Sequence, residues 1–117
     1  MEEAGVLAVE DVAGSRTWFS DYLKWLTTHP YGVDEMNAKN NHGTAFDIQV
    51  ARYALFVGKH DIAEKVIKEF PAKRLFKQIE PNGSQPLELA RTTAFGYSVF
   101  NLTHFIDMAI MARSLNI

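Results

Sequence analysis

The segment 43–57 reads GTAFDIQVARYALFV, and its apolar residues recur with the period of an α-helix. Phe46, Val50 and Tyr53 follow one another at intervals of four and three residues, so a helix would carry them on one face. Gly58 comes directly after the segment, and glycine is favoured where a helix ends in the left-handed conformation. We therefore predict a helix over this segment, with one face packed against a neighbour.

Helical spacing continues on both sides of this segment. Before it, residues 15–28 form a predicted helix with Ser15 as its N-cap. After it, a third helix is expected to begin beyond Asp61 and to be interrupted at Pro71, and a long last helix covers about 93–114. No run of five or more residues alternates as a strand would, so the predicted class is all-α, with the helix–turn–helix alternation of stacked helical pairs.

Three short stretches are expected to break the helices. They are 29–32 (HPYG), 58–61 (GKHD) and 81–84 (PNGS), and each carries proline or glycine. We expect turns at all three places.

The composition is that of a folded domain. The chain has 117 residues and 13.2 kDa, with 47% hydrophobic and 22% charged residues, which fits one domain over 1–117 or a piece of a larger one. The net charge of −2 argues against a general nucleic-acid binder, which needs a basic surplus. No apolar run approaches the roughly 20 residues that cross a membrane. The chain has no cysteine, and its start, MEEAG, does not resemble a signal peptide.

Aromatic side chains are numerous for so few helices, at 12% of the residues. Some of the rings could be covered by a second subunit or by a further part of the protein. Self-association through exposed apolar helix faces is therefore one expectation.

Two groups of residues could carry chemistry, and the first is 40–43, NNHG. Asn40 or Asn41 is a suitable N-cap for the helix that follows, with His42 in its first turn. The same corner could bind a carboxylate, because a helix N-terminus attracts anions and an amide and an imidazole lie beside it. The residues by themselves leave both interpretations open.

The second group contains Arg91 and Tyr97. Six residues apart on one regular helix, they would point in different directions, so they can share a groove only if a helix begins between them. A threonine at 92–93 is a suitable N-cap for that helix, which would carry Tyr97, Asn101 and His104 on one face. A half-buried tyrosine and a core histidine are the alternatives.

No cofactor motif is present. The histidines show no paired metal-binding spacing, and there is no phosphate-binding glycine loop and no nucleophile elbow. We therefore expect no metal and no cofactor.

Three blocks of the sequence together resemble a known family. Residues 39–50, KNNHGTAFDIQV, are similar to the NNHGTWYD-Q signature of the alginate lyase family of polysaccharide lyases. Residues 78–92, QIEPNGSQPLELART, and 97–102, YSVFNL, resemble the second and third blocks, and 18–26, WFSDYLKWL, fits the preceding helix. The resemblance covers nearly the whole chain in the family's order.

The resemblance implies a fold, a substrate and a compartment. It implies antiparallel helical hairpins that form part of an (α/α) toroid, here the central catalytic portion of longer proteins. The groove of such a toroid binds an anionic polysaccharide, alginate or another polyuronate, and cleaves it by β-elimination without a cofactor. The location would be periplasmic or extracellular.

The resemblance also assigns roles to residues. Asn41, His42 and Arg91 match the positions that neutralise the uronate carboxylate, so that the charge formed when the C5 proton leaves is stabilised. Tyr97 matches the tyrosine that removes this proton and protonates the leaving O4, with His42 as the rival base for a proton on the other face of the sugar.

Three further residues lie within the blocks that resemble the family and are predicted to contact the substrate. They are Asn40, Gln85 and Asn101.

Two departures from the family pattern leave other functions open. The chain has Ala45-Phe46 where the family often has Trp-Tyr, and Gly96 where it often has His before the tyrosine. A non-catalytic carbohydrate-binding module would tolerate these changes. An α/α-toroid glycoside hydrolase is a third interpretation, and it would need two carboxylates across the scissile bond.

Overall fold

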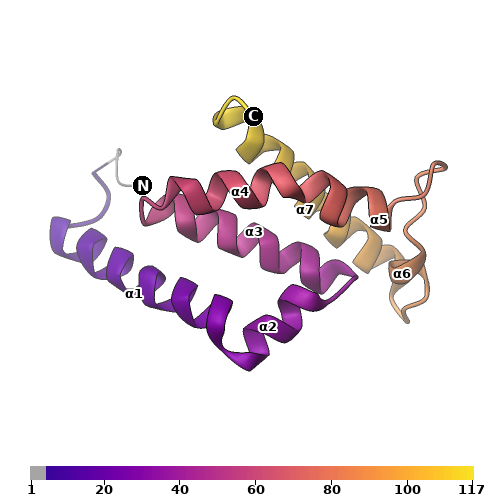
Figure 1. Ribbon diagram of the computed structural model, residues 1–117, viewed down its shortest axis with the longest axis horizontal. Helices are drawn as coiled ribbons and strands as arrows, with labels where there is room; N and C mark the ends of the chain where they lie inside the picture. Colours follow the sequence, from indigo (N-terminus) through magenta and orange to yellow (C-terminus); the bar gives the residue numbers. More distant parts are fainter. Residues whose placement is uncertain (1–4) are drawn as a thin grey trace.

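The computed structural model of the protein describes residues 5–117, and every regular element in this range is a helix. Helices α3 (Asn41–Phe56) and α4 (His60–Phe70) run antiparallel and side by side (Figure 1). Helix α1 (Val9–Thr28) packs against α3, and α7 (Ala94–Ser114) packs against both α3 and α4. The predicted all-α class is confirmed.

Helix α1 is longer than predicted. It begins at Val9 and not at Ser15, and it ends at Thr28 as expected. Ala8, at its N-cap, makes no side-chain hydrogen bond, but Glu10 and Asp11 lie in the first turn. Acidic side chains there interact favourably with the positive end of the helix dipole, so a strong cap is not needed.

The expected break at 29–32 is a change of direction between two helices. The chain bends at His29, and Pro30 opens a new helix, α2 (Pro30–Asn37). Proline suits this first position, because its fixed φ is helical and its missing N–H would have had no partner. The Nδ1 atom of His29 accepts a hydrogen bond from the N–H of Tyr31 at 3.2 Å and caps the helix.

The turn between α3 and α4 follows the prediction in part. Gly58 has a φ of +81°, the left-handed conformation expected of the residue that ends the helix. Asp61 is not the N-cap of α4, however. Lys59 holds that position without a side-chain bond, and Asp61 lies in the first turn, where its charge still favours the helix.

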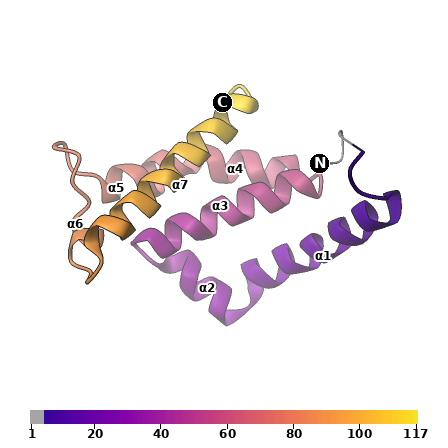
Figure 2. The same ribbon diagram turned by 180° about the vertical axis from the view of Figure 1, so that it is seen from behind.

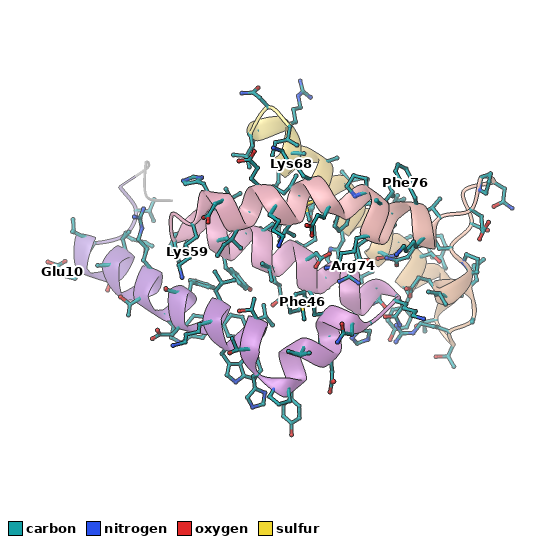
Figure 3. The ribbon with its side chains drawn as sticks, viewed as in Figure 1. Glu10, Phe46, Lys59, Lys68, Arg74 and Phe76 are labelled. Atoms are coloured by element: carbon teal, nitrogen blue, oxygen red, sulfur yellow. The ribbon has the colours of Figure 1, made fainter. Side chains whose placement is uncertain are left out.

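Pro71 changes the type of helix but does not break it. The chain continues through a π-helical segment, η1 (Pro71–Leu75), into the short α5 (Phe76–Gln78). The N–H of Phe76 bonds to the carbonyl of Pro71, five residues back. This wider turn accommodates the proline and sets the direction of Arg74, which lies between η1 and the junction of α2 with α3 (Figure 3).

Two apolar clusters hold the helices together, and α3 contributes to both. Leu23 and Leu26 of α1 pack with Phe46 of α3, which points into the angle between α1 and α2 (Figure 3). On another face of α3, Ile48 packs with Phe105 of α7. Because it is buried from two sides, α3 is the fixed frame on which the candidate site is built.

The last part of the chain folds back along the α3–α4 pair. An irregular segment leads through the short α6 (Pro86–Leu89) into α7, which passes in front of the α4–α5 stretch in Figure 2 and packs on both α3 and α4. One side of α7 is unusually apolar and exposed, at Phe95, Val99, Leu102, Ile106 and Ile110. No helix within residues 5–117 is both long and apolar enough to span a membrane.

Candidate functional site

An open groove of about 680 Å³ lies where α1, α2 and α3 meet the start of α7. Its lining combines aromatic rings with a small number of polar side chains, which is the usual composition of a ligand pocket. The aromatic residues are Tyr22, Trp25, Tyr31, Phe46, Tyr97 and Phe100, and the polar ones are Glu35, Asn41, His42, Gln49 and Arg91.

The first predicted group forms one part of the groove, at the N-terminus of α3. Asn40 is the N-cap, and its Oδ1 accepts the N–H of His42 at 3.0 Å. Asn41 is the next residue and is buried. Its backbone N–H donates to Oε1 of Glu88 at 2.7 Å, across 47 positions of sequence. Asn40 therefore caps the helix, and its neighbour Asn41 lines the groove.

Arg91 connects the first predicted group to the second. Its Nη1 donates to Oδ1 of Asn41 at 2.7 Å and lies 3.7 Å from Oε2 of Glu88. A guanidinium only donates hydrogen bonds, so the Asn41 atom facing it must be the carbonyl oxygen. The Nδ2 amide of Asn41 is then left as a donor for a ligand.

Tyr97 lies directly against Arg91. The Cζ atom of Arg91 is 3.5 Å from the centre of the Tyr97 ring, a close cation–π contact. As the sequence predicts, a helix begins between the two residues, because α7 starts at Ala94 with Thr93 at its N-cap. Within residues 5–117 no group is hydrogen-bonded to the Tyr97 hydroxyl, which leaves it available to a ligand.

His42 has a partner that the sequence does not reveal. Its Nδ1 atom lies 2.8 Å from Oε2 of Glu35, on α2. Both side chains are about half exposed and both line the groove.

A buried ion pair fixes the turn that precedes His42. The guanidinium of Arg74 bonds to both carboxylate oxygens of Asp47, at 2.7 and 3.2 Å. It also donates to the backbone carbonyls of Ala38 and Met36 at 2.7 and 2.8 Å. Because Arg74 bonds to Asp47 of α3 and to the backbone of residues 36 and 38, this cluster stabilises the end of α2 and the start of α3.

Gln85 and Asn101, which are predicted to contact the substrate, do not line the groove. Both are buried, and Nδ2 of Asn101 donates to Oε1 of Gln78 and of Gln85, at 3.0 and 2.9 Å. Nε2 of Gln85 donates in turn to the Ser98 carbonyl at 3.0 Å. Their polar atoms bind the segment before α7 to the interior. Asn40 is also absent from the groove lining, because its side chain caps α3.

His104 shares α7 with Tyr97 but lies away from the groove. Its ring packs on Phe100, with the ring centres 4.3 Å apart. Burial lowers the pKa of His104, with the carboxylate of Asp107 acting in the opposite direction and Arg52 adding to the decrease. Within residues 5–117 no three histidine or acidic side chains are grouped as metal ligands would be.

Glu35 and Glu88 are the site residues that the sequence analysis does not single out. Glu88 lies within the block 78–92, where it is one of several acidic residues, and no local pattern indicates that it is buried. Glu35 lies outside all the blocks, on a helix that was not predicted. Both become visible only when segments distant in sequence are brought together.

Comparison with known proteins gives one family. The family model described as alginate lyase matches residues 1–117. A crystal structure of an alginate lyase from Bacteroides ovatus at 1.60 Å resolution is similar, with a TM-score of 0.93 and 50% sequence identity. The match covers 98% of this chain and 30% of that one, so the chain spans less than a third of that protein. Among curated proteins, none matches the chain.

Proposed function

The chain belongs to the alginate lyase family, and on that basis we propose that it forms the catalytic part of a polysaccharide lyase. The proposed substrate is a uronate-containing polysaccharide, alginate or one similar to it. The proposed reaction is β-elimination, which removes the proton at C5 and breaks the bond between C4 and O4. Such a substrate places the working protein in the periplasm or outside the cell.

One observation carries this proposal. Asn41, His42, Arg91 and Tyr97 come from segments up to 56 positions apart (97 − 41), and all four line one open groove. They are also the residue types that this chemistry needs, with two groups that donate hydrogen bonds, an imidazole and a phenol.

The carboxylate of the sugar is the first requirement of the reaction. Its negative charge disfavours removal of the neighbouring proton, so it must be neutralised as charge forms on it. Arg91 provides a fixed cation, and the Nδ2 amide of Asn41 provides a donor whose direction the 2.7 Å bond to Arg91 sets. His42 completes the set at the edge of the groove.

Proton transfer is the second requirement. Tyr97 is the proposed proton-transfer group, because its phenol lines the groove. The guanidinium of Arg91 lies against its ring, with Cζ 3.5 Å from the ring centre, and holds the ring in place. In a syn elimination, Tyr97 takes the C5 proton and passes a proton to O4 on the same face of the sugar.

The groove lining favours a lyase over a hydrolase. A glycoside hydrolase needs a pair of carboxylates across the scissile bond. Among the described residues that line the groove, Glu35 is the single carboxylate, and its Oε2 atom is already in contact with Nδ1 of His42.

The proposal is tested by incubating the full-length protein with alginate and with other polyuronates. β-Elimination leaves a double bond conjugated to the carboxylate, and ultraviolet absorbance follows its formation. We expect absorbance to rise on at least one polyuronate. Hydrolysis products without the double bond would favour the hydrolase, and saturable binding without turnover would favour a binding module. Either result would overturn the proposal.

Substitutions in the groove are expected to act on turnover more than on stability. Tyr97→Phe should abolish the absorbance signal, since no group replaces the phenol oxygen. Arg91→Ala and His42→Ala should each lower kcat/KM by about 100-fold or more. Thermal unfolding of each variant provides the control. If the His42 and Arg91 variants simply fail to fold, these roles lose their support.

A further inference from the structure

We infer that Glu35 is a positioning residue that holds the His42 ring as a proton acceptor. The inference rests on the proposed function and narrows the role of His42 within it. The observation behind it is the 2.8 Å contact between Oε2 of Glu35 and Nδ1 of His42, with both residues in the groove lining.

The contact decides where the proton of a neutral ring resides. A carboxylate accepts hydrogen bonds, so the ring nitrogen beside it must carry the hydrogen. The proton therefore lies on Nδ1, and Nε2 keeps a free lone pair. When Nε2 gains a proton the ring becomes positive, and the negative charge of Glu35 stabilises it.

The site keeps its other functions when His42 acts in this way. Asn41 and Arg91 still provide a hydrogen-bond donor and a cation for the sugar carboxylate, because the 2.7 Å bond between them does not involve the imidazole. His42 is thus free to act on the proton at C5. Tyr97 comes from a different helix, α7, so two proton-transferring groups reach the groove from separate elements.

Two such groups match the two C5 epimers found in alginate. In mannuronate, the C5 proton and O4 lie on the same face of the ring, so one residue can serve both. In guluronate they lie on opposite faces, and a second residue is needed. The Glu35–His42 pair would supply it.

The guluronate reaction can be written in full. The C5–H bond breaks and its proton passes to Nε2 of His42, which becomes an imidazolium. The electron pair of that bond forms the C4=C5 double bond as the C4–O4 bond breaks. O4 leaves with the proton of the Tyr97 hydroxyl, and the imidazolium then returns its proton to the tyrosine oxygen through solvent.

The first test reads the ring directly. The full-length protein is labelled with ¹⁵N in its histidine rings, and its spectrum is recorded at a pH where the His42 ring is neutral. His42→Ala identifies the signal. We expect the hydrogen on Nδ1, and we expect Glu35→Leu to abolish that preference, whereas Glu35→Gln retains an acceptor and should retain part of it. A wild-type ring with its hydrogen on Nε2 would overturn the inference.

The second test separates positioning from mere stability. Partners that orient a metal-binding histidine typically contribute about 10- to 100-fold to metal affinity or activity, and we expect an effect of similar size for the partner of a proton-accepting histidine. We expect Glu35→Leu to lower kcat on oligoguluronate by about that factor, with a much smaller effect on oligomannuronate and little change in KM. Asp34→Leu is the matched control, since Asp34 is an exposed carboxylate on the same helix outside the groove.

The outcomes distinguish this inference from the proposed function. Equal losses on both epimers, or none on either, would overturn the role of Glu35 while leaving the lyase activity in place. A wild-type protein inactive on every polyuronate would overturn both, whatever the spectrum shows.

Discussion

At the scale of single residues, Arg91 lies against three different kinds of group at the groove: an amide, a carboxylate and an aromatic ring. Its Nη1 atom reaches Asn41, its charge lies near Glu88, and its flat face covers the ring of Tyr97. One guanidinium therefore orients the proposed donor and the proposed base together. Lysine could not replace it, because an ammonium group lacks both the planar face and the fork of donors.

His104 provides a prediction about pH. Because burial lowers its pKa in the folded protein, the unfolded chain binds a proton at His104 more readily. The free energy of unfolding should therefore decrease as the pH falls below about 6.5, the ordinary pKa of histidine. Above that pH the ring is neutral in both states, and the effect is absent.

Urea unfolding at about pH 7.5 and pH 5.5 measures this effect, with the pH window set by the ordinary histidine pKa. His104→Gln should show a smaller loss of stability on acidification than the wild type. His60→Gln removes an exposed histidine and serves as the control. Identical losses in wild type and His104→Gln would contradict the prediction.

The sequence predicted which residues line the groove better than it predicted which groups surround each of them. The motif blocks point to Asn41, His42, Arg91 and Tyr97, which do line one groove. The same blocks also contain polar residues that face inward, and nothing in the pattern distinguishes them. The buried Asn101 shows why, since its amide partners come from segments 16 and 23 positions away.

At the scale of helices, the period of the apolar residues predicted where helices exist better than how they begin. The helices α3 and α7 lie within two residues of their expected bounds, because strong signals flank them. Helix α2 was missed, because Pro30 was interpreted only as an end. Proline is also favoured in the first turn of a helix, and the local sequence does not show whether a proline ends one helix or begins the next.

The first turn of α3 depends on a residue without a side chain. A Cβ atom on Gly43 would overlap the carbonyl oxygen of Ala38 and Nη1 of Arg74. Gly43→Ala should therefore displace the cluster around Arg74 and lower stability by about 2 kcal/mol or more. Denaturant unfolding measures the change.

Gly96→Ala is the matched substitution on α7. A Cβ atom there meets nothing within 4 Å, and the residue lies in a helix. We expect this change to be neutral or to stabilise the protein by up to about 1 kcal/mol. Equal destabilisation by both alanines would show that the lack of space around Gly43 is not the reason why alanine destabilises the protein there.

At the scale of the whole molecule, the apolar side of α7 is uncovered in this chain. Phe95 is 83% exposed, and Ile106 and Ile110 are more than half exposed. The similar Bacteroides ovatus chain is more than three times as long as the part matched here. The (α/α) toroid remains the expected context for this face, and a second copy of the chain is the alternative cover.

Self-association of the 117-residue chain is therefore expected when it is studied alone. Light scattering should give a mass above 13.2 kDa that rises with concentration. Leu102→Lys combined with Ile106→Lys should return it to the monomer, since burying two charges is costly. Thr103→Lys with Ser114→Lys adds the same charge at exposed polar positions of α7 and should not. A monomer at every concentration would contradict the prediction.

The π-helical segment after α4 has a consequence for how such chains can diverge. A π turn holds one residue more than the α turn it replaces, so deleting any one residue from 71–75 would restore an α-helix. The helix beyond it would keep its direction, because a π turn and an α turn each make one revolution, but the residues of the turn itself, Arg74 among them, would take new positions relative to Asp47. Over evolutionary time, insertions and deletions there should be purged more strictly than exchanges of one amino acid for another. In an alignment of homologues the conserved property would be the spacing itself.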